Sequence, residues 1–275
     1  MFIDRASHSK LDTYEECKLK YYRKYVEHLP EQRDTKATDF GSFIHKVFEE
    51  CPNSQNLDEL VEKAVSLVKR FNIPEDYFDL TITCLKHFIE FNAKLTSKTL
   101  STELKFKLEV PNDVPYNGVI DRIEQSEQGS LLILDYKTSK SEKDIKNLRE
   151  DKQLTGYAFA ANKLYNVPYS KIVVGILYVR TGKFITTQVT ELDVKKFLAG
   201  RRQLIWEIRK SKKNDFKPKK QKYCNWCGFK SVCPLFFPDT IVESRLKLLK
   251  PKPKPTSHIE LLDDTTLDQS THKTS

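Results

Sequence analysis

The hydrophobic pattern of this chain changes its period near residue 100. Before that point, apolar residues recur at the three- and four-residue spacing of helices that bury one face. The segments 102–110, 116–124 and 130–137 alternate instead, which predicts three strands joined by short turns. Each pattern leaves one apolar face to cover, so the chain must pack helices against a sheet.

Helices are predicted on both sides of this strand region. The N-terminal part has helical spacing over four segments, which are 9–29, 40–50, 57–71 and 77–95. The third strand is followed by a helix over 143–165, a β-branched strand over 172–179, an alternating strand over 183–190 and a helix over 192–211. This order predicts an α/β fold with a mixed central sheet flanked by helices.

The C-terminal region has a different composition. Lysine and proline alternate from Lys250 to Pro255, and a Ser/Thr-rich stretch follows, so this region cannot pack a core. We expect one folded domain over 1–247 and a flexible tail over 248–275. The apolar group Ile259 to Leu262 can dock on a partner, and a wholly solvated tail is the alternative.

The net charge of +9 favours a polyanionic partner such as nucleic acid, although many basic proteins bind none. Lysines and aromatic residues intermingle over 210–229, which suits either a track for a single strand or a solvated basic surface. The chain has no apolar run of 18 residues and no apolar core of a secretory signal near Met1. We expect no membrane association and an intracellular location, in the cytoplasm or nucleoid or, for a phage protein, in the host cytoplasm.

Two carboxylates come at the ends of neighbouring predicted strands. Asp121 ends the second strand, and Asp135 follows the apolar run Leu131–Leu134. Lys137 shares a face with Asp135, because side chains alternate along a strand. Such carboxylates suit Mg²⁺ or Mn²⁺, and an ammonium beside them stabilises phosphate charge during hydrolysis. Ordinary strand-end charges are the alternative, since Asp-X-Lys alone is common.

The chain has six cysteines, and closely spaced cysteines in a reducing compartment are typically metal ligands. One compact C-terminal loop carries three of them, Cys224, Cys227 and Cys233. Three ligands leave a tetrahedral arrangement incomplete, and Cys17 is the candidate for the fourth. The spacing fits an iron–sulfur cluster, a zinc site or unliganded thiols. Cys51 and Cys84 lie in apolar helical segments and are expected in the core.

Taken together, the ordered motifs resemble the RecB-like branch of the PD-(D/E)XK nucleases. That branch includes CRISPR-associated RecB-like exonucleases, the nuclease domains of bacterial recombination helicases and exonuclease V. The resemblance covers roughly residues 8–237 and implies a restriction-endonuclease-like core. The matching motifs are Gly41 with His45, Gly118 to Arg122, Asp135 to Thr138, and Gln153 with Tyr157.

The resemblance also implies roles for individual residues. The implied ligands of Mg²⁺ or Mn²⁺ are His45, Asp121, Asp135 and the backbone carbonyl of Tyr136, with Glu103 as an auxiliary ligand. The implied catalytic residues are Asp121, Asp135 and Lys137. Gln153 and Tyr157 would orient Lys137 or contact the substrate, or else form an ordinary half-buried helix face. An imidazole ligand favours Mn²⁺ over Mg²⁺.

The same family holds a [4Fe–4S] cluster with one cysteine before the nuclease core and three after it. Here these would be Cys17, Cys224, Cys227 and Cys233, which would join the segments 9–29 and 222–237, with Zn²⁺ as the alternative.

The implied activity is a metal-dependent DNA exonuclease that cuts single-stranded or end-exposed DNA during recombination, repair, or phage or CRISPR DNA processing. The chain has no Gly-X4-Gly-Lys-Ser/Thr motif, so helicase activity requires a separate partner, which the tail can contact. One alternative is a non-catalytic DNA-end-binding or assembly factor that retains the nuclease fold. Another is a zinc-bound DNA-binding module in which the acidic residues are incidental.

Overall fold

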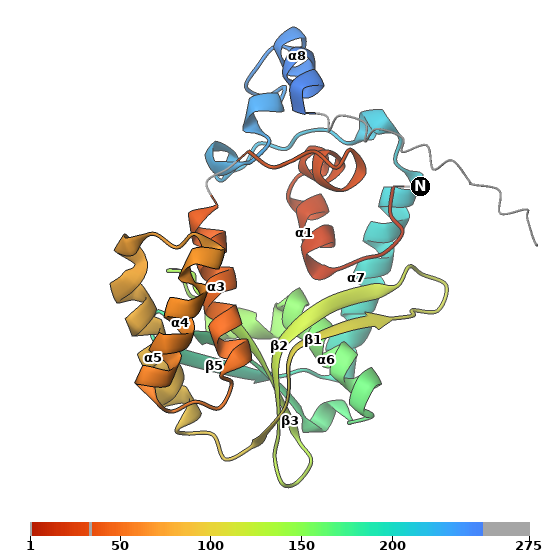
Figure 1. The fold of residues 1–275 in the computed structure, drawn as a ribbon. Coiled ribbons are helices and arrows are strands. Elements are labelled where there is room, and N and C mark those ends of the chain that lie inside the picture. The colour runs from red at the N-terminus through yellow and green to blue at the C-terminus, as the bar shows by residue number, and fades with distance from the viewer. Residues whose placement is uncertain (1, 33–34, 250–275) are drawn as a thin grey trace, which may run out of the picture.

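The computed structural model describes residues 2–32 and 35–249, and a five-stranded sheet lies at its centre (Figure 1). Its strands are β1 (Lys98–Leu108), β2 (Tyr116–Gln125), β3 (Leu131–Lys137), β4 (Ile172–Tyr178) and β5 (Lys183–Gln188), in the spatial order β1-β2-β3-β4-β5. The strands β3 and β4 are parallel and all other neighbours are antiparallel. The predicted mixed sheet and three-strand meander are therefore confirmed.

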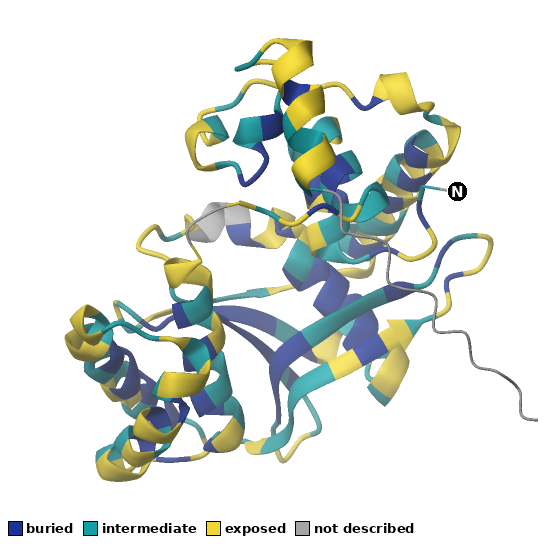
Figure 2. Cartoon of the chain, turned by 45° about the horizontal axis from the view of Figure 1, so that its top comes forward, coloured by how far each residue is buried: buried dark blue, intermediate teal, exposed yellow. Residues whose placement is uncertain are grey.

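Helices cover both faces of this sheet, as Figures 1 and 2 show. On one side lie α3 (Lys36–Glu50), α4 (Leu57–Phe71) and α5 (Phe78–Asn92), and on the other lie α6 (Lys152–Tyr165) and α7 (Glu191–Lys210). Successive side chains of β3 point to opposite faces of the sheet and so contribute to both apolar cores. Ile133 packs on the α6 side, and Leu134 and Tyr136 pack on the α3 side. The predicted α/β class is confirmed.

The predicted helix over 9–29 is wrong in one respect, because it is broken at Cys17. The structure has α1 (His8–Glu16), α2 (Lys18–Tyr21) and a π-helical turn (Tyr22–Val26), and Cys17 between them has extended backbone with φ −157° and ψ 112°. The break brings the Cys17 side chain to the pocket that the three C-terminal cysteines also line. Helical periodicity alone does not reveal such a break.

Two other predicted helices have different bounds. The segment 143–165 is a 3₁₀ helix (Ile145–Glu150) followed by α6, because the Asp151 side chain accepts hydrogen bonds from the backbone N–H groups of Gln153 (2.8 Å) and Leu154 (3.0 Å) and so starts a new helix. The helix predicted from residue 40 begins at Lys36, so Gly41 lies within it.

The C-terminal part consists of short turns and one helix. The turns are Lys213–Asp215, Cys224–Trp226 and Lys230–Val232, and the helix is α8 (Asp239–Leu249); short 3₁₀ turns also precede α5 (Glu75–Tyr77) and β4 (Tyr169–Lys171). We call residues 213–249 the cysteine module. The helix α8 continues to Leu249, two residues into the predicted tail, and the rest of the tail with the Ile259–Leu262 group lies outside the described residues.

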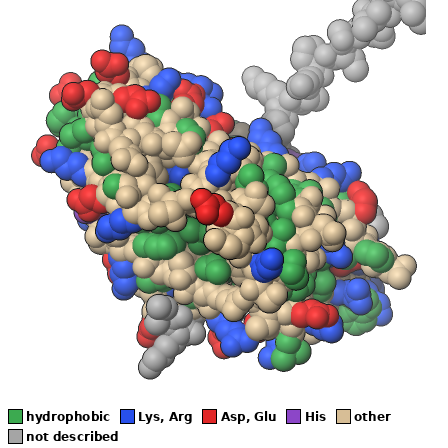
Figure 3. Space-filling model, turned by 90° about the horizontal axis from the view of Figure 1, so that it is seen from below, with side chains coloured by type: hydrophobic (Ala, Val, Ile, Leu, Met, Phe, Trp, Pro, Cys, Tyr) green, Lys and Arg blue, Asp and Glu red, His purple; other side chains and the backbone are tan. Residues whose placement is uncertain are grey.

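The surface shows no single basic face in the view from below (Figure 3), where Lys and Arg are interspersed with Asp and Glu and with apolar patches. Among the residues that the structure describes, no helix combines the length and apolar character that crossing a bilayer requires.

Candidate active site

The imidazole of His45 joins α3 to the end of β3, the middle strand of the sheet. Its Nε2 lies 2.9 Å from the backbone oxygen of Tyr136 in β3, and its Nδ1 faces the carboxylates of β1 and β2. Gly41, one turn earlier in α3, permits this approach, because a Cβ there would lie only 3.2 Å from Thr138 Oγ1. The spacing of Gly41 and His45 thus has a physical reason, which is the close contact of α3 with the end of β3.

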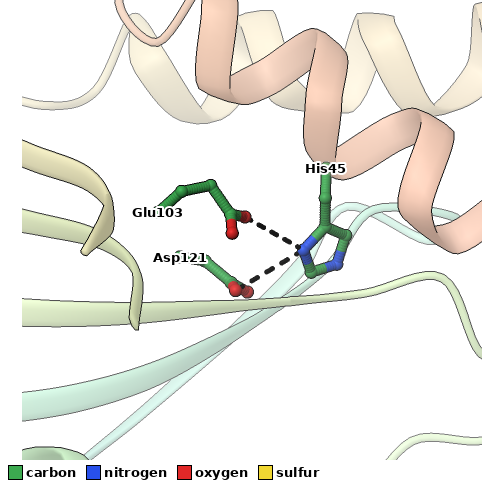
Figure 4. Close-up of side chains that lie close together, drawn as sticks. All are labelled: His45, Glu103 and Asp121. Carbon is green, nitrogen blue, oxygen red and sulfur yellow. Dashed lines mark ion pairs between the residues drawn. The ribbon is translucent and has the colours of Figure 1, made fainter. Parts of the chain in front are cut away.

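Glu103 and Asp121 converge on His45, as Figure 4 shows. His45 Nδ1 lies 3.7 Å from Glu103 Oε1 and 3.5 Å from Asp121 Oδ1, and one donor atom from each of the three residues lies within 4.8 Å of the others. Glu103 has a left-handed backbone with φ +46°, a conformation that is strained for a residue other than glycine and is found disproportionately at functional sites. Glu103, expected only as an auxiliary ligand, is thus a full member of this group.

Asp121 is fixed from two sides. Its Oδ2 accepts a hydrogen bond from the Tyr136 backbone N–H at 2.7 Å, while Oδ1 faces His45. Only 8% of Asp121 is exposed. One oxygen is therefore used to hold β3, and the other faces the group of candidate ligands.

Asp135 and Lys137 form a second pair next to this group. Asp135 Oδ2 lies 2.7 Å from Lys137 Nζ but accepts no hydrogen bond of ordinary geometry from any described residue. Lys137 Nζ donates to Gln153 Oε1 at 3.1 Å, and Gln153 Nε2 donates to the Tyr157 hydroxyl at 2.8 Å. The structure thus places Gln153 and Tyr157 in a chain of contacts that ends on Lys137.

The charges in this region leave room for a cation. Burial raises the pKa of Asp135 to about 6, although the Lys137 ammonium opposes this shift. Burial alone would lower the pKa of His45, but attraction to Asp121 outweighs burial and raises that pKa to about 10. The Asp135 shift is thus caused mainly by burial, and the His45 shift by the neighbouring carboxylates of Asp121 and Glu103.

The donor set fits a hard divalent cation. Carboxylate and carbonyl oxygens with one imidazole suit Mg²⁺ or Mn²⁺, and the buried Asp135 Oδ2 lacks the hydrogen bond that a buried oxygen normally has. Two expected ligands lie differently from the other three. Asp135 is not in the group of His45, Glu103 and Asp121, whose donor atoms lie within 4.8 Å of one another, and the Tyr136 backbone oxygen contacts His45 Nε2.

The four cysteines expected to act together line one pocket of about 300 Å³, between the break at Cys17 and the cysteine module. The Gln32 N–H donates to the Gly228 oxygen at 2.8 Å, and Ser231 Oγ donates to Gln32 Oε1 at 2.7 Å, so backbone and side chains also join the two segments. No three of the four sulfurs, all of them described, lie within 4.8 Å of one another. Cys51 and Cys84 are buried in the helical core, as predicted.

Comparisons with known proteins agree with this geometry. A model of the PD-(D/E)XK nuclease superfamily matches residues 5–234. A protein of Streptococcus agalactiae, named as one subunit of an ATP-dependent helicase/deoxyribonuclease, is 30% identical over 194 residues, which cover 63% of this chain and 18% of the relative. The protein of the same name from Streptococcus mutans is 28% identical over 191 residues, which cover 62% of this chain and 18% of that relative. The chain thus spans less than a fifth of the length of these curated relatives.

A solved structure supports the same fold. A protein from Eubacterium rectale, provisionally named an exonuclease, superposes with a TM-score of 0.53 at 12% identity, over 81% of this chain and 86% of that one. The RecB-like resemblance of the motifs is confirmed by the relatives, and the family match extends over most of the described residues. The chain therefore belongs to the PD-(D/E)XK nuclease superfamily.

Proposed function

We propose that this protein hydrolyses phosphodiester bonds in DNA with a divalent cation, and that it acts as an exonuclease on single-stranded or end-exposed DNA. The observation that carries the proposal is the Asp135–Lys137 ion pair of 2.7 Å next to the group of His45, Glu103 and Asp121. Family membership makes this group the expected cutting centre.

The proposed metal ligands are His45, Glu103, Asp121, Asp135 and the Tyr136 carbonyl. A bound Mg²⁺ or Mn²⁺ would polarise the phosphate and lower the pKa of a water molecule. The strands β1, β2 and β3 hold the carboxylates and the carbonyl in place, and α3 brings in the imidazole. This preorganisation leaves little rearrangement to make during the reaction.

Lys137 acts as a cation in this proposal. Burial would lower the pKa of Lys137, but the Asp135 carboxylate raises it above its ordinary value, so the ammonium keeps its proton at neutral pH. A charged ammonium stabilises negative charge on the phosphate oxygens and can hold the attacking water, but it cannot act as the base. The hydrogen bond to Gln153 Oε1 fixes its direction.

The choice of DNA as substrate rests on the relatives, whose name includes deoxyribonuclease. The preference for ends rests on the resemblance to RecB-like exonucleases, and that for single strands on the lysines and exposed aromatic residues around the cysteine module. Trp226 and Tyr223 are 74% and 59% exposed there, and Lys222 Nζ lies 4.8 Å from the centre of the Tyr223 ring. Exposed aromatic rings next to lysines suit stacked bases and phosphates. A helicase partner is proposed by analogy with the same relatives.

We also propose that the four cysteines hold a [4Fe–4S] cluster and that residues 1–247 form one domain closed by it. A tetrahedral zinc site with bonds of about 2.3 Å needs sulfurs roughly 3.8 Å apart. The choice of the cluster over zinc rests on the resemblance to the RecB-like nucleases, and the four cysteines line one pocket. Free thiols of this kind suit an intracellular, reducing compartment.

The test is digestion of DNA labelled at its 5′ or 3′ end, as single and double strands, with Mn²⁺ or Mg²⁺ in parallel. We expect stepwise shortening from an end, stronger with Mn²⁺, and loss of cutting when EDTA is added. Internal cuts in closed circular DNA would contradict the exonuclease assignment. Absence of cutting with either metal, on DNA with free ends, would contradict the proposed function.

A further inference from the structure

The guanidinium of Arg122 is buried next to the candidate active site. Arg122 follows Asp121 in β2, and alternation along the strand points the two side chains in opposite directions. Only 1% of Arg122 is exposed, which is exceptional for an arginine. The proposed cutting chemistry gives Arg122 no role, so its burial needs another explanation.

All five N–H groups of this guanidinium have an acceptor. Nε donates to Glu124 Oε1 (2.7 Å), Nη1 to the Pro52 oxygen (2.6 Å) and Asn92 Oδ1 (2.8 Å), and Nη2 to Asn53 Oδ1 (3.2 Å) and Thr99 Oγ1 (3.1 Å). The Glu124 carboxylate is fully buried and balances the charge. A buried arginine is tolerated when it is paired and fully hydrogen-bonded in this way.

The acceptors belong to the elements that carry the candidate metal ligands. Pro52 and Asn53 directly follow α3, which carries His45; Thr99 lies in β1, which carries Glu103; and Glu124 lies in β2, which carries Asp121. Asn92 at the end of α5 ties this network to the helical layer. One side chain thus joins α3, β1 and β2 at a second point, away from the ligands themselves.

We propose that Arg122 is a positioning residue that sets the spacing of His45, Glu103 and Asp121 and thereby the affinity for the divalent cation. This inference rests on the proposed metal-dependent function. The helix α3 is not part of the hydrogen-bonded sheet, so contacts made by side chains fix the position of α3 relative to the strands. Thr99 also lies just before the irregular pairing at Ser101 and the left-handed backbone of Glu103. A strained backbone of this kind persists only when neighbouring contacts hold it, and the hydrogen bond from Arg122 to Thr99 is one such contact.

The decisive variant is Arg122→Lys, because lysine keeps the charge but cannot supply five donors in a planar fork. We expect the apparent Kd for Mn²⁺, from calorimetric or electron paramagnetic resonance titration of the metal alone, to rise about 10- to 100-fold. Cleavage should return to within a few-fold of the wild-type rate at saturating Mn²⁺, since Arg122 contacts neither metal nor substrate in this proposal.

The matched control is Arg201→Lys. Arg201 is also a buried, paired arginine, 2% exposed, which donates to Asp113 and to the Val114 oxygen after β1. It lies over the ring of Tyr116 at the start of β2, five residues before Asp121, and hydrogen-bonds to none of the candidate ligands. Its replacement should lower the unfolding temperature and leave the Kd for Mn²⁺ unchanged. Thr99→Val, which removes one acceptor at a half-buried position, should give a smaller rise in Kd and tests the idea if Arg122→Lys does not fold.

An unchanged Kd for Mn²⁺ in folded Arg122→Lys or in Thr99→Val would overturn the inference, as would an equal rise in Arg201→Lys. The titration needs no nuclease activity. Wild-type protein that binds Mn²⁺ but cuts no DNA would contradict the proposed function, while the differences in Kd would still decide the role of Arg122.

Discussion

The candidate active site and the cysteine module are built in opposite ways. The first is enclosed by the two large apolar clusters on either side of the sheet, and its side chains are held by strands and long helices. The second has short turns and a small apolar cluster in which Phe229, Val232 and Val242 pack with Leu29 of the N-terminal segment. The side chains of the candidate active site are therefore positioned by the main fold, whereas the cysteine module has few buried apolar contacts of its own.

Because of this difference, we expect changes in the candidate active site to affect mainly catalysis and changes in the cysteine module to affect mainly stability. The candidate active site contains a buried carboxylate, Asp135, and a Glu103 backbone in a strained conformation, and such features are retained at an energetic cost. A bound group in the cysteine module would instead close a long loop and so stabilise the folded state. Changes in the two regions should accordingly affect different measurements.

The largest effect is expected for Asp135→Asn. We predict that cleavage of end-labelled DNA falls about 10⁴-fold, or roughly 5 kcal/mol of transition-state stabilisation, because a proposed metal ligand and the partner of Lys137 is lost. The unfolding temperature should stay the same or rise, since burial disfavours the Asp135 charge. If the Asp135→Asn variant cuts at the wild-type rate, the assignment of Asp135 to the cutting centre is wrong.

The next effect is expected for Cys224→Ser. We predict loss of bound iron and of absorption near 400 nm in anaerobically purified protein, together with about 3 kcal/mol of stability by analogy with other cross-links that close long loops. The control is Cys84→Ala, which alters a buried core cysteine and should leave the iron content unchanged. A colourless wild-type protein with stoichiometric zinc would contradict the cluster.

A smaller effect is expected for Gln153→Ala. The hydrogen bond from the Lys137 ammonium to Gln153 Oε1 would be lost, which should lower kcat by roughly 2 kcal/mol, or about 30-fold, because the bond is to a charged group. Stability should change little, since Gln153 is half-buried near the start of α6. A clear fall in the unfolding temperature together with the fall in kcat would instead indicate that Gln153 has a structural role.

The smallest effect is expected for Tyr157→Phe. This change removes only the hydroxyl that accepts from Gln153 Nε2, so kcat should fall by about 1 kcal/mol, or roughly fivefold. In the double variant with Gln153→Ala, the Tyr157 change should add nothing, because its effect passes through Gln153. Additive losses would show that Tyr157 acts independently.

Much of the fold could be predicted from the sequence, because period and turn residues report on elements whose apolar faces are buried. The strands β2, β3 and β4 and the helix α4 lie within about two residues of their predicted bounds. The break at Cys17 was missed, because it depends on contacts with residues some 200 positions later. Propensity is a local quantity and cannot report such contacts.

The candidate site could be predicted only in part. Asp121, Asp135 and Lys137 belong to one short meander, so strand alternation brings them together. The close approach of Glu103 to His45 and Asp121 could not be predicted, because no neighbouring residue in the sequence indicates the left-handed backbone of Glu103. The role now proposed for Arg122 likewise depends on which loops and helices lie against it.

The contact between the N-terminal segment and the cysteine module has a consequence for biosynthesis. The two parts are separated by about 200 residues, and Gln32 cannot pair with Gly228 before both have been translated. At 5–20 residues per second, the ribosome needs roughly 10–40 s to translate the residues between them. The sheet that carries the candidate site ends at Gln188, so during this interval the sheet and its acidic side chains can come together before the cysteine module has been made.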